Sequence, residues 1–445
     1  MTGIFKAYDI RGIYGETIDE DTVYKIGRAY VIKFKPKTVT IGMDGRISSP
    51  SLFEALVKGI TDQGCNVINI GLVTTPMMYF SSWNYPQYDG GLMVSASHNP
   101  PKYNGVKMVR QGSVPIGGDT GIYEIEEMIN NGLPNELPEQ KGEVTELDVF
   151  NPYLKHSLTY IPENLNKFKI VIDTANAVGG PIANAFFKKI DCEFTHLFPE
   201  VDGNFPNHEA NPLKEENVLD LIKSVKENNA NIGVGFDGDA DRVAFIDEQG
   251  GIVPSDLLIA LIAKEILKEK PGVKIEADVR CSRIVLETVK ENGGIPRRCN
   301  VGHSLVKKQM REDKVYFAGE LSSHFYLEDE HYAEAPFYVI LKVLQIMSET
   351  NKPLSELIEP YKKYSQSGEI NSKVEDKDGK MKELESKFSE GQISWLDGIT
   401  VEFDDWWFNV RPSNTEPYLR LNLEGNTQEL MEEKRDIVLS IIRST

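Results

Sequence analysis

Three aspartates stand at alternate positions in one short segment of the chain, between two apolar runs. The first run covers residues 232–236, and the second covers residues 243–246. Such runs on either side of a short polar segment predict two strands joined by a loop that holds Asp237, Asp239 and Asp241. Crowded carboxylates repel one another unless a cation neutralises them, and oxygen ligands without Cys or His favour Mg²⁺, Ca²⁺ or Mn²⁺ over zinc. The segment therefore predicts a hard-cation site with coordination positions open to a phosphate oxygen.

Two other interpretations of this segment are an acidic turn on a solvated face and a calcium loop of the EF-hand type. The calcium loop has some support, because Glu248 stands at the twelfth position counted from Asp237, where such a loop carries a bidentate glutamate. The sixth position, however, requires glycine for a sharp turn, and this chain has Arg242 there. The strand-like run 243–246 also stands where the calcium loop would continue. We therefore favour a cation site between two strands.

A serine follows another strand-like run farther upstream. The run 91–95 leads directly into the segment that contains Ser97. Pro100 has a fixed φ and biases Asn99 away from helix, so we expect Ser97 on a rigid loop at a strand end, where catalytic groups often lie. The alternative is a plain turn rich in Ser, Asn and Pro. The segment lacks the glycine-flanked serine of a hydrolase nucleophile elbow, and His98 is expected to order the loop, because neighbours in an extended chain point apart.

Together the two segments resemble the α-D-phosphohexomutase superfamily. Residues 95–100 match its serine loop, and residues 237–242 match its metal loop. The resemblance implies that Ser97 is phosphorylated in the resting enzyme and that its phosphate and the three aspartates bind one Mg²⁺. It also implies that Lys107 is an acid/base candidate and that a hexose 1,6-bisphosphate is the activator.

Further segments match the same family in the same order along the chain. They are residues 7–12, 41–46, 74–76, 301–304, 319–324 and 411–417. The resemblance implies catalytic roles for Arg11, Arg242 and His303. It implies sugar-hydroxyl binding by Glu320 and Ser322, and a substrate-binding role for Arg280, which stands where many relatives have Lys and whose planar fork differs from a point charge. Ser323 replaces the commoner glycine, and His324 is equally well explained as a structural histidine.

The segment 411–417 has the composition of a phosphate site that needs no metal. A guanidinium, two hydroxyls and consecutive backbone N–H groups in a turn together suit a dianionic phosphate. In the family this loop binds the phosphate that is not reacting. The residues that we expect to bind it here are Arg411, Ser413, Asn414, Thr415 and Arg420.

A chain of 445 residues is too long for one ordinary core. Alternating strand-like and helix-like runs predict an α/β protein with four domains, of which three are sandwiches with mixed, mainly parallel sheets and the last is α+β. The resemblance implies that these domains surround a central cleft. The expected domains are a phosphoserine-loop domain at 1–150, a metal-binding domain at 151–252, a sugar-recognition domain at 253–368 and a C-terminal phosphate-binding domain at 369–445.

Several elements are specific enough to test. Strands are expected at residues 39–42, 67–70, 91–94, 168–173 and 399–403, and helices at residues 50–63, 255–268, 336–347 and 427–444. Ser255 is expected to cap its helix, because serine oxygens accept from the first-turn N–H groups. The stretch 336–347 has an amphipathic pattern.

The formal net charge is −19, which argues against nucleic acid or an anionic membrane as a partner. An anionic substrate then requires positive charge to be concentrated locally, and the groups we expect in the cleft are Arg11, Lys107, Arg242, Arg280, Arg411 and Arg420. The four cysteines have no metal spacing, and the N-terminus has no signal pattern, so we expect reduced thiols and a cytoplasmic protein. No run is long and apolar enough to span a bilayer. The chain is expected to be a monomer or a homodimer.

The resemblance implies a phosphohexomutase, most similar to the phosphomannomutase/phosphoglucomutase branch, which acts on hexose phosphates. Phosphoglucosamine mutase is the nearest alternative, and Asn414 with the Glu320 and Ser322 pair favours the hexose branch. A serine phosphomonoesterase is a rival reaction class, but its dizinc forms need several histidine ligands, and the seven histidines here are scattered. A calcium-sensing or scaffold protein is the rival outside enzymology.

Overall fold

The computed structural model describes residues 3–413 and 417–444. The chain forms two compact units. Unit 1 consists of Met1–Val253 and Ser322–Leu357, and unit 2 consists of Pro254–Leu321 and Ile358–Thr445. The chain therefore leaves unit 1, returns to it for one segment, and ends in unit 2. The two units are described separately below.

Unit 1 begins with a mixed sheet. Its strands are, in spatial order, β1 (Ile10–Ile13), β5 (Tyr103–Arg110), β4 (Gly90–Val94), β2 (Thr38–Met43), β3 (Asn66–Leu72) and β7 (Val144–Glu146), and β6 (Val114–Pro115) pairs with β5. Strand β2 is parallel to β3 and β4, whereas β5 is antiparallel to β4 and β1. Because parallel neighbours end at the same sheet edge, the loops after β2 and β4 lie side by side. The second of these loops carries Ser97.

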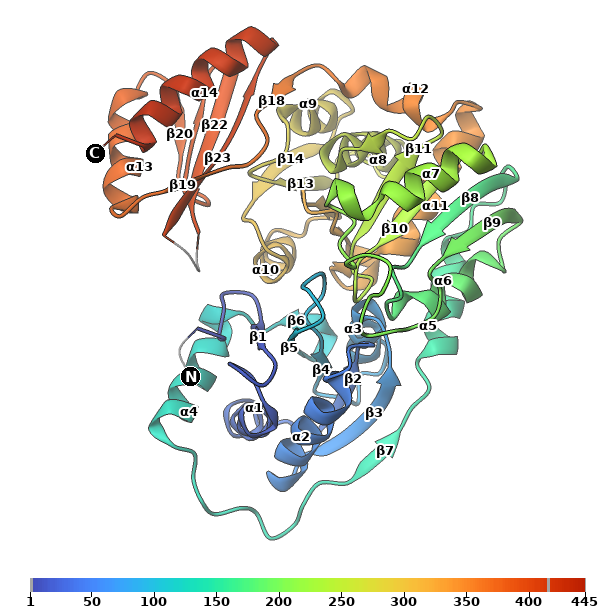
Figure 1. Ribbon diagram of the computed structural model, residues 1–445, viewed down its shortest axis with the longest axis vertical. Helices are drawn as coiled ribbons and strands as arrows, with labels where there is room; N and C mark the ends of the chain where they lie inside the picture. The colour runs from blue at the N-terminus through green and yellow to red at the C-terminus, as the bar shows by residue number, and fades with distance from the viewer. Residues whose placement is uncertain (1–2, 414–416, 445) are drawn as a thin grey trace. The chain divides into compact units, whose positions relative to one another are not determined.

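Four helices accompany this sheet. They are α1 (Glu20–Phe34), α2 (Ser49–Asp62), α3 (Thr75–Asn84) and α4 (Ile122–Asn131). Helices α1 and α2 pack against each other, and α3 contacts β2 and β4 (Figure 1). The strand positions Val39, Ile41, Leu92 and Val94 are fully buried in the resulting core. The fixed core explains why the strand ends can hold loops in defined positions.

A second mixed sheet of unit 1 carries the aspartates. Its strands are, in spatial order, β12 (Ile252–Val253), β11 (Val243–Asp247), β10 (Ile232–Phe236), β8 (Phe168–Asp173) and β9 (Cys192–Leu197). Strands β10 and β11 are antiparallel, and their register pairs Phe236 with Val243. The turn between these two residues is therefore the segment that holds the three aspartates, and the predicted pair of strands is confirmed.

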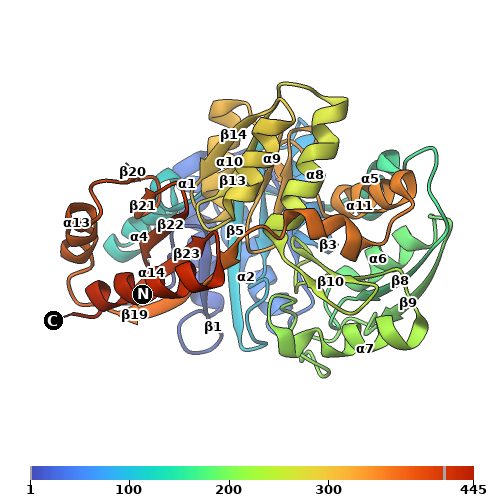
Figure 2. The ribbon, with the colours of Figure 1, turned by 90° about the horizontal axis from the view of Figure 1, so that it is seen from above.

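The helices of this second part are α5 (Phe150–Ser157), α6 (Gly179–Phe187) and α7 (Leu219–Asn228), and α7 runs alongside β8 and β10 (Figures 1 and 2). The returning segment adds β16 (Phe325–Leu327), β17 (Ala333–Glu334), α11 (Pro336–Thr350) and α12 (Leu354–Ile358). The amphipathic interpretation of α11 was wrong, because this helix is buried on nearly every side from Pro336 to Met347. Its Phe337 packs on Phe186 of α6 with ring centroids 4.2 Å apart.

Unit 2 opens with three parallel strands. They are β14 (Ile295–Cys299), β13 (Lys274–Asp278) and β15 (Phe317–Gly319), and their helices are α8 (Ser255–Glu269), α9 (Arg283–Glu291) and α10 (His303–Asp313). The predicted helix at 255–268 is confirmed as α8. Its predicted cap is wrong, because Pro254 occupies the N-cap position and Ser255 is the first helical residue.

Unit 2 ends in an antiparallel sheet. The strands are, in spatial order, β18 (Ser365–Gln366), β23 (Tyr418–Gly425), β22 (Trp406–Pro412), β21 (Ile399–Glu402) and β20 (Gln392–Ser394), and β19 (Ile370–Lys373) also pairs with β23. The helices α13 (Lys377–Lys387) and α14 (Gln428–Ile442) lie together against this sheet (Figure 1). Thr427 caps α14 by accepting from the N–H of Leu430. The α+β prediction for this part is confirmed.

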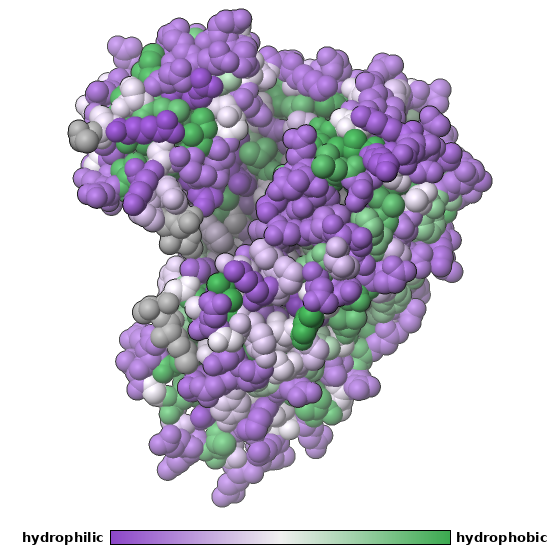
Figure 3. Space-filling view, viewed as in Figure 1, coloured by the Kyte–Doolittle hydropathy of each residue, from purple (hydrophilic) through white to green (hydrophobic). Residues whose placement is uncertain are grey.

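The surface agrees with the charged composition. The face in Figure 3 is mostly hydrophilic, with hydrophobic residues scattered among polar ones. Within residues 3–413 and 417–444, no helix combines the length and the apolar character that crossing a bilayer requires. All four cysteines lie in these ranges and none of them forms a disulfide.

Candidate active site

The three aspartates gather at the turn between β10 and β11. Asp237, Asp239 and Asp241 are almost fully buried, and each offers a carboxylate oxygen within 4.8 Å of the others. Burial and then the charges of Asp241 and Asp239 raise the pKa of the Asp237 carboxyl above its ordinary value. Such mutual repulsion is what a bound cation relieves.

Ser97 lies directly beside this aspartate cluster. Its hydroxyl donates a 2.7 Å hydrogen bond to Oδ2 of Asp237, and its Oγ is 3.3 Å from Nδ1 of His98. The backbone of Ser97 has a φ of 49°, in the left-handed region, and its N–H donates to the side-chain oxygen of Ser95. The serine loop and the metal loop, 140 residues apart in the chain, therefore meet through their side chains.

Gly238 makes this close approach possible. A Cβ atom at position 238 would lie 2.3 Å from the carbonyl oxygen of Ser97, which is closer than any real contact of that kind. A side chain at this position would push the serine loop away from the aspartates. The glycine between the first two aspartates is thus a packing requirement of the two loops.

Lys107 extends from β5 into the same cluster. Its ammonium lies 2.6 Å from a carboxylate oxygen of Asp239 and 2.6 Å from one of Asp241. Burial alone would lower the pKa of Lys107, but the two carboxylates outweigh burial and raise that pKa well above its usual value. Burial likewise acts to raise the pKa of Asp241, and Lys107 and His324 outweigh it and hold that pKa well below its usual range. Lys107 is therefore an ammonium group here.

Two arginines border the cluster in unit 1. Arg11, on β1, donates to Oδ1 of Asn99 in the serine loop and pairs with Asp9. Arg242 donates from its backbone N–H to Oδ1 of Asp237, and its Nε lies 3.6 Å from Oδ2 of the same residue. The structure thus brings together Ser97, Lys107, Arg11, Arg242 and the aspartates, all of which were expected in the site.

The donor set fits a hard cation. Asp239 accepts at Oδ2 from Lys107 and from the hydroxyl of Thr75, at 2.6 and 2.5 Å. Its other oxygen, Oδ1, is buried, and the described part of the chain provides no hydrogen-bond partner for it. A buried carboxylate oxygen without a donor is costly unless a cation or water satisfies it. Three carboxylates and the Ser97 oxygen are the ligands that Mg²⁺ prefers.

The position of Glu248 also argues against the calcium-loop interpretation. Glu248 does not face the aspartates. Its carboxylate accepts from the hydroxyl and the backbone N–H of Ser355.

A second group of polar side chains lies in unit 2. Arg280 donates from Nε and from a terminal nitrogen to the two oxygens of Asp278, at 3.0 and 2.7 Å. Glu320 is buried, accepts from the backbone N–H of Gly302 at 2.8 Å, and lies 3.9 Å from Arg280. His303 is the first residue of α10 and follows Gly302 directly. The expected residues Arg280, Glu320 and His303 therefore belong to one neighbourhood.

Ser322 is placed differently from Glu320. It belongs to unit 1, where its Oγ is 3.1 Å from Nδ1 of His324. The boundary between the two units falls directly after Leu321.

The expected phosphate loop is also in unit 2. Arg411 on β22 and Arg420 on β23 stand opposite each other in the strand register, and both pair with Glu369. The hydroxyl of Ser413 lies 3.5 Å from Arg420, and its carbonyl accepts from Lys377 at 3.0 Å. Asn414 and Thr415 lie outside the described residues.

Four domain models of one family match nearly the whole chain. They are the phosphoglucomutase/phosphomannomutase alpha/beta/alpha domains I, II and III, at residues 2–136, 149–251 and 254–364, and the C-terminal domain, at residues 369–440. The chain belongs to this family.

Individual members of the phosphoglucomutase/phosphomannomutase family are similar over their full length. A phosphomannomutase from Methanocaldococcus jannaschii is 40% identical over 99% of this chain and 97% of its own. A phosphomannomutase/phosphoglucomutase from Pseudomonas putida is 36% identical over 98% of this chain and 94% of its own. The crystal structure of a family protein from Burkholderia thailandensis has a TM-score of 0.91 at 33% identity, covering 99% of this chain and 97% of that one.

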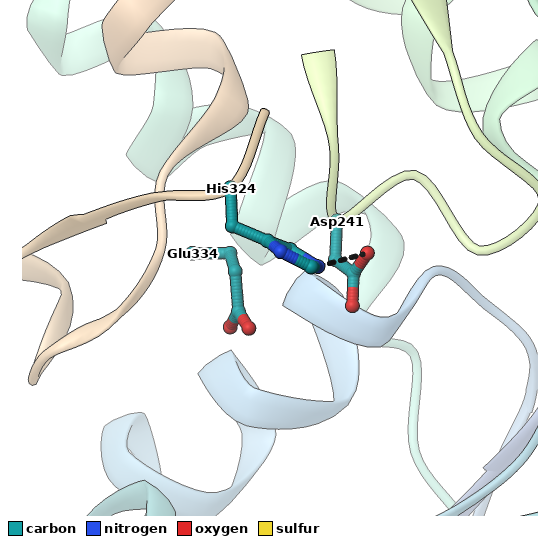
Figure 4. A group of neighbouring side chains, drawn as sticks. All are labelled: Asp241, His324 and Glu334. Carbon is teal, nitrogen blue, oxygen red and sulfur yellow. Dashed lines mark ion pairs between the residues drawn. The ribbon is translucent and has the colours of Figure 1, made fainter. Parts of the chain in front are cut away.

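The sequence did not predict that His324 would lie next to Asp241 of the metal loop. Its Nε2 lies 3.3 Å from Oδ1 of Asp241, and Arg242 donates to it from Nε at 3.3 Å. Figure 4 shows the imidazole pointing toward Asp241, with Glu334 beside it. The signal available in the sequence was the position of His324 two residues after Ser322, at the end of a matched segment.

Sequence reasoning also assigned no role to Arg46. This residue follows β2 and is only 1% exposed. Its guanidinium pairs with Asp44 and donates to the carbonyl oxygens of Ser97, Asn99 and Pro100 in the serine loop and to that of Tyr103 at the start of β5. Arg46 therefore holds the loop that displays Ser97.

Proposed function

We propose that the chain is a phosphohexomutase, an isomerase that moves a phosphoryl group between C1 and C6 of a hexose phosphate. Mannose and glucose phosphates are the proposed substrates. Ser97 carries the phosphoryl group and transfers it to the free O1 or O6 hydroxyl. The resulting hexose 1,6-bisphosphate then reorients end for end, and Ser97 receives the other phosphate. A hexose 1,6-bisphosphate serves as the activator that first phosphorylates Ser97.

One observation carries this proposal. The Ser97 hydroxyl lies 2.7 Å from a carboxylate of the buried aspartate cluster, and the other two aspartates of that cluster pair with the Lys107 ammonium. A serine in this setting suits phosphoryl transfer, because an oxygen-only cluster binds a hard cation next to the phosphate oxygens. The full-length similarity to mutases supports the same reaction class.

The residues of unit 1 then have distinct tasks. Mg²⁺ bound by Asp237, Asp239, Asp241 and the Ser97 phosphate would supply positive charge to the transferring oxygens. Lys107 holds Asp239 and Asp241 in place, and its ammonium would donate to the phosphoryl group carried by Ser97. Arg11 positions the serine loop through Asn99.

The positions of one arginine and two histidines suggest roles in phosphate binding and proton transfer. Arg242 borders Asp237 and His324, so it can offer charge to phosphate oxygens. His324, between Asp241 and Ser322, is a candidate proton carrier in unit 1, and His303 is the candidate in unit 2.

Substrate recognition is proposed for the other charged and polar groups. Glu320 and Ser322 bind sugar hydroxyls, and Arg280, oriented by Asp278, binds the sugar phosphate. The phosphate that is not reacting is bound by Arg411, Ser413, Asn414, Thr415 and Arg420. In chain order, the four proposed domains carry the phosphoserine loop, bind the metal, recognise the sugar and bind the phosphate that is not reacting.

Mass measurement tests the proposal directly. The intact protein is treated with glucose 1,6-bisphosphate, and we expect a gain of one phosphate, about 80 Da, located on Ser97. The Ser97→Ala protein is the control and should gain nothing. A gain at another residue, or none in the parent protein with its Mg²⁺ present, would contradict the assignment of Ser97.

The two rival activities are separated by product analysis. A phosphomonoesterase would release inorganic phosphate from mannose 1-phosphate, whereas a mutase forms mannose 6-phosphate without net release. Comparison of kcat/KM for mannose, glucose and glucosamine 1-phosphates then ranks the hexose substrates against the phosphoglucosamine alternative.

A further inference from the structure

A single glutamate bridges the two arginines of the expected phosphate loop. Glu369 stands between β18 and β19, and one of its carboxylate oxygens lies 2.7 Å from a terminal nitrogen of Arg411. The other oxygen lies 3.2 Å from a terminal nitrogen of Arg420. Because Arg411 and Arg420 are paired in the register of β22 and β23, one carboxylate reaches both guanidinium groups at once.

Glu369 is charged but is not sealed in the core. Burial acts to raise the pKa of its carboxyl, but Arg411 outweighs this effect, with help from Arg280 and Arg420, and the pKa is lowered. The side chain is 26% exposed, against 7% for Arg411 and 28% for Arg420. Water therefore reaches the carboxylate, which is also where a competing anion would approach the arginines.

The arginines present the geometry that a phosphate uses. A guanidinium donates in a planar fork to two oxygens of a carboxylate or of a phosphate, so the two anions compete for the same N–H groups. Ser413 and Lys377 lie near these arginines. The hydroxyl of Ser413 is 3.5 Å from Arg420, and Lys377 donates to the carbonyl oxygen of Ser413. Glu369 thus sits as an anion in a cluster of cationic and hydroxyl groups.

We propose that Glu369 is a built-in competitor for the phosphate that Arg411 and Arg420 bind. This inference rests on the proposed function. A bound phosphate displaces the Glu369 carboxylate from the arginines, and the carboxylate takes its place again when the phosphate leaves. The proposed reaction requires the loop to release one phosphate of the bisphosphate and accept the other, so an internal anion limits how tightly the intermediate is held.

The alternative role for Glu369 predicts the opposite sign. If the carboxylate only orients Arg411 and Arg420 for the phosphate, its removal weakens phosphate binding. If it competes with the phosphate, its removal strengthens binding, because the arginines are vacant and the repulsion between two anions is lost. One substitution therefore separates the two roles.

The test is a titration of the full chain with glucose 1,6-bisphosphate. The Ser97→Ala background prevents phosphoryl transfer, and Glu369→Gln keeps the shape of the side chain while removing its charge. We expect Kd for the bisphosphate to fall about three- to tenfold, and KM for glucose 1-phosphate to fall in the protein that retains Ser97. An unchanged or higher Kd would overturn the competitor role.

Two further variants make the result unambiguous. Glu375→Gln removes the same charge from an exposed position in the same part of unit 2, and it should leave Kd unchanged, which excludes a general charge effect. Arg411→Ala tests the phosphate site itself and should raise Kd at least tenfold. If Arg411→Ala has no effect, the proposed site is wrong. If it weakens binding but Glu369→Gln does not tighten it, only the inference about Glu369 fails.

Discussion

The guanidinium of Arg46 donates a 2.6 Å hydrogen bond to the carbonyl oxygen of Ser97. The same group donates to two more carbonyl oxygens of the serine loop and to that of Tyr103 at the start of β5, and it pairs with Asp44 at 3.0 Å. Because β2 and β4 are parallel neighbours, the loop that carries Arg46 lies next to the loop that carries Ser97. The left-handed backbone at Ser97 is thus held by a side chain from another loop.

Replacing Arg46 by Lys should slow phosphoryl transfer more than it weakens substrate binding. An ammonium group cannot reach the several oxygens that a guanidinium spans, and each lost hydrogen bond to a charged group is worth about 1.5–3 kcal/mol. We expect kcat to fall at least about tenfold while KM changes less than about threefold. The rate of Ser97 phosphorylation by glucose 1,6-bisphosphate, measured by mass, should fall in parallel.

A purely structural role for Arg46 would give a different pattern. In that case the melting temperature would fall, while the fraction that remains folded would phosphorylate Ser97 at the parent rate. Thermal unfolding of the parent and of Arg46→Lys under the assay conditions distinguishes the two cases.

The strand ends in unit 1 could be predicted because their signals are local. The apolar runs before Ser97 and before Asp237 were both identified, and both strands exist as predicted. The spacing of the aspartates also indicated their shared site. These features depend on residues within a few positions of each other, where periodicity and turn chemistry are informative.

The contacts of Arg46 and His324 could not be derived in the same way. Arg46 meets a loop 51 residues away, and His324 meets Asp241 across a much longer stretch of chain. Neither residue stands in a charge pattern that reveals its partner. The amphipathic pattern of α11 misled for a related reason, because the helix is buried on nearly every side and its Tyr338 packs on Tyr160, which is distant in sequence.

Ser97→Ala should abolish mutase turnover and leave substrate binding largely intact. The substitution removes the oxygen that is proposed to carry the phosphoryl group but keeps the small size of a residue that is only 2% exposed. Turnover is measured with mannose 1-phosphate, and binding is measured by titration with glucose 1,6-bisphosphate. Turnover close to that of the parent would show that another residue carries the phosphoryl group.

Asp239→Asn should weaken Mg²⁺ binding and lower kcat. The variant keeps the volume of the side chain but removes one of three buried charges, and it replaces one carboxylate oxygen by an NH₂ group, which donates hydrogen bonds and cannot bind a cation. A loss of about 3 kcal/mol in transition-state stabilisation corresponds to about a hundredfold in kcat. Mg²⁺ titrations of activity should show a half-saturating concentration at least about tenfold higher.

Asp220→Asn is the matched control for this effect. Asp220 is an exposed carboxylate on α7 of unit 1, so its removal changes the net charge equally without touching the cluster. The control should keep the parent Mg²⁺ dependence. If Asp239→Asn behaves like this control, the cation site lies elsewhere in the chain.

Arg411→Ala should release the reaction intermediate. The bisphosphate has to be retained while it reorients end for end. Arg411 pairs with Glu369 and is 7% exposed, so it is the less exposed of the two arginines proposed to bind the distal phosphate. We expect KM to rise at least about tenfold and free hexose 1,6-bisphosphate to accumulate, while Ser97 is still phosphorylated, because its own loop is unchanged. Bisphosphate in solution is measured per product formed, and Lys382→Ala, an exposed cation on α13, is the control that should not leak. A variant at position 411 that turns over normally and leaks no more than the parent would remove the retention role from this loop.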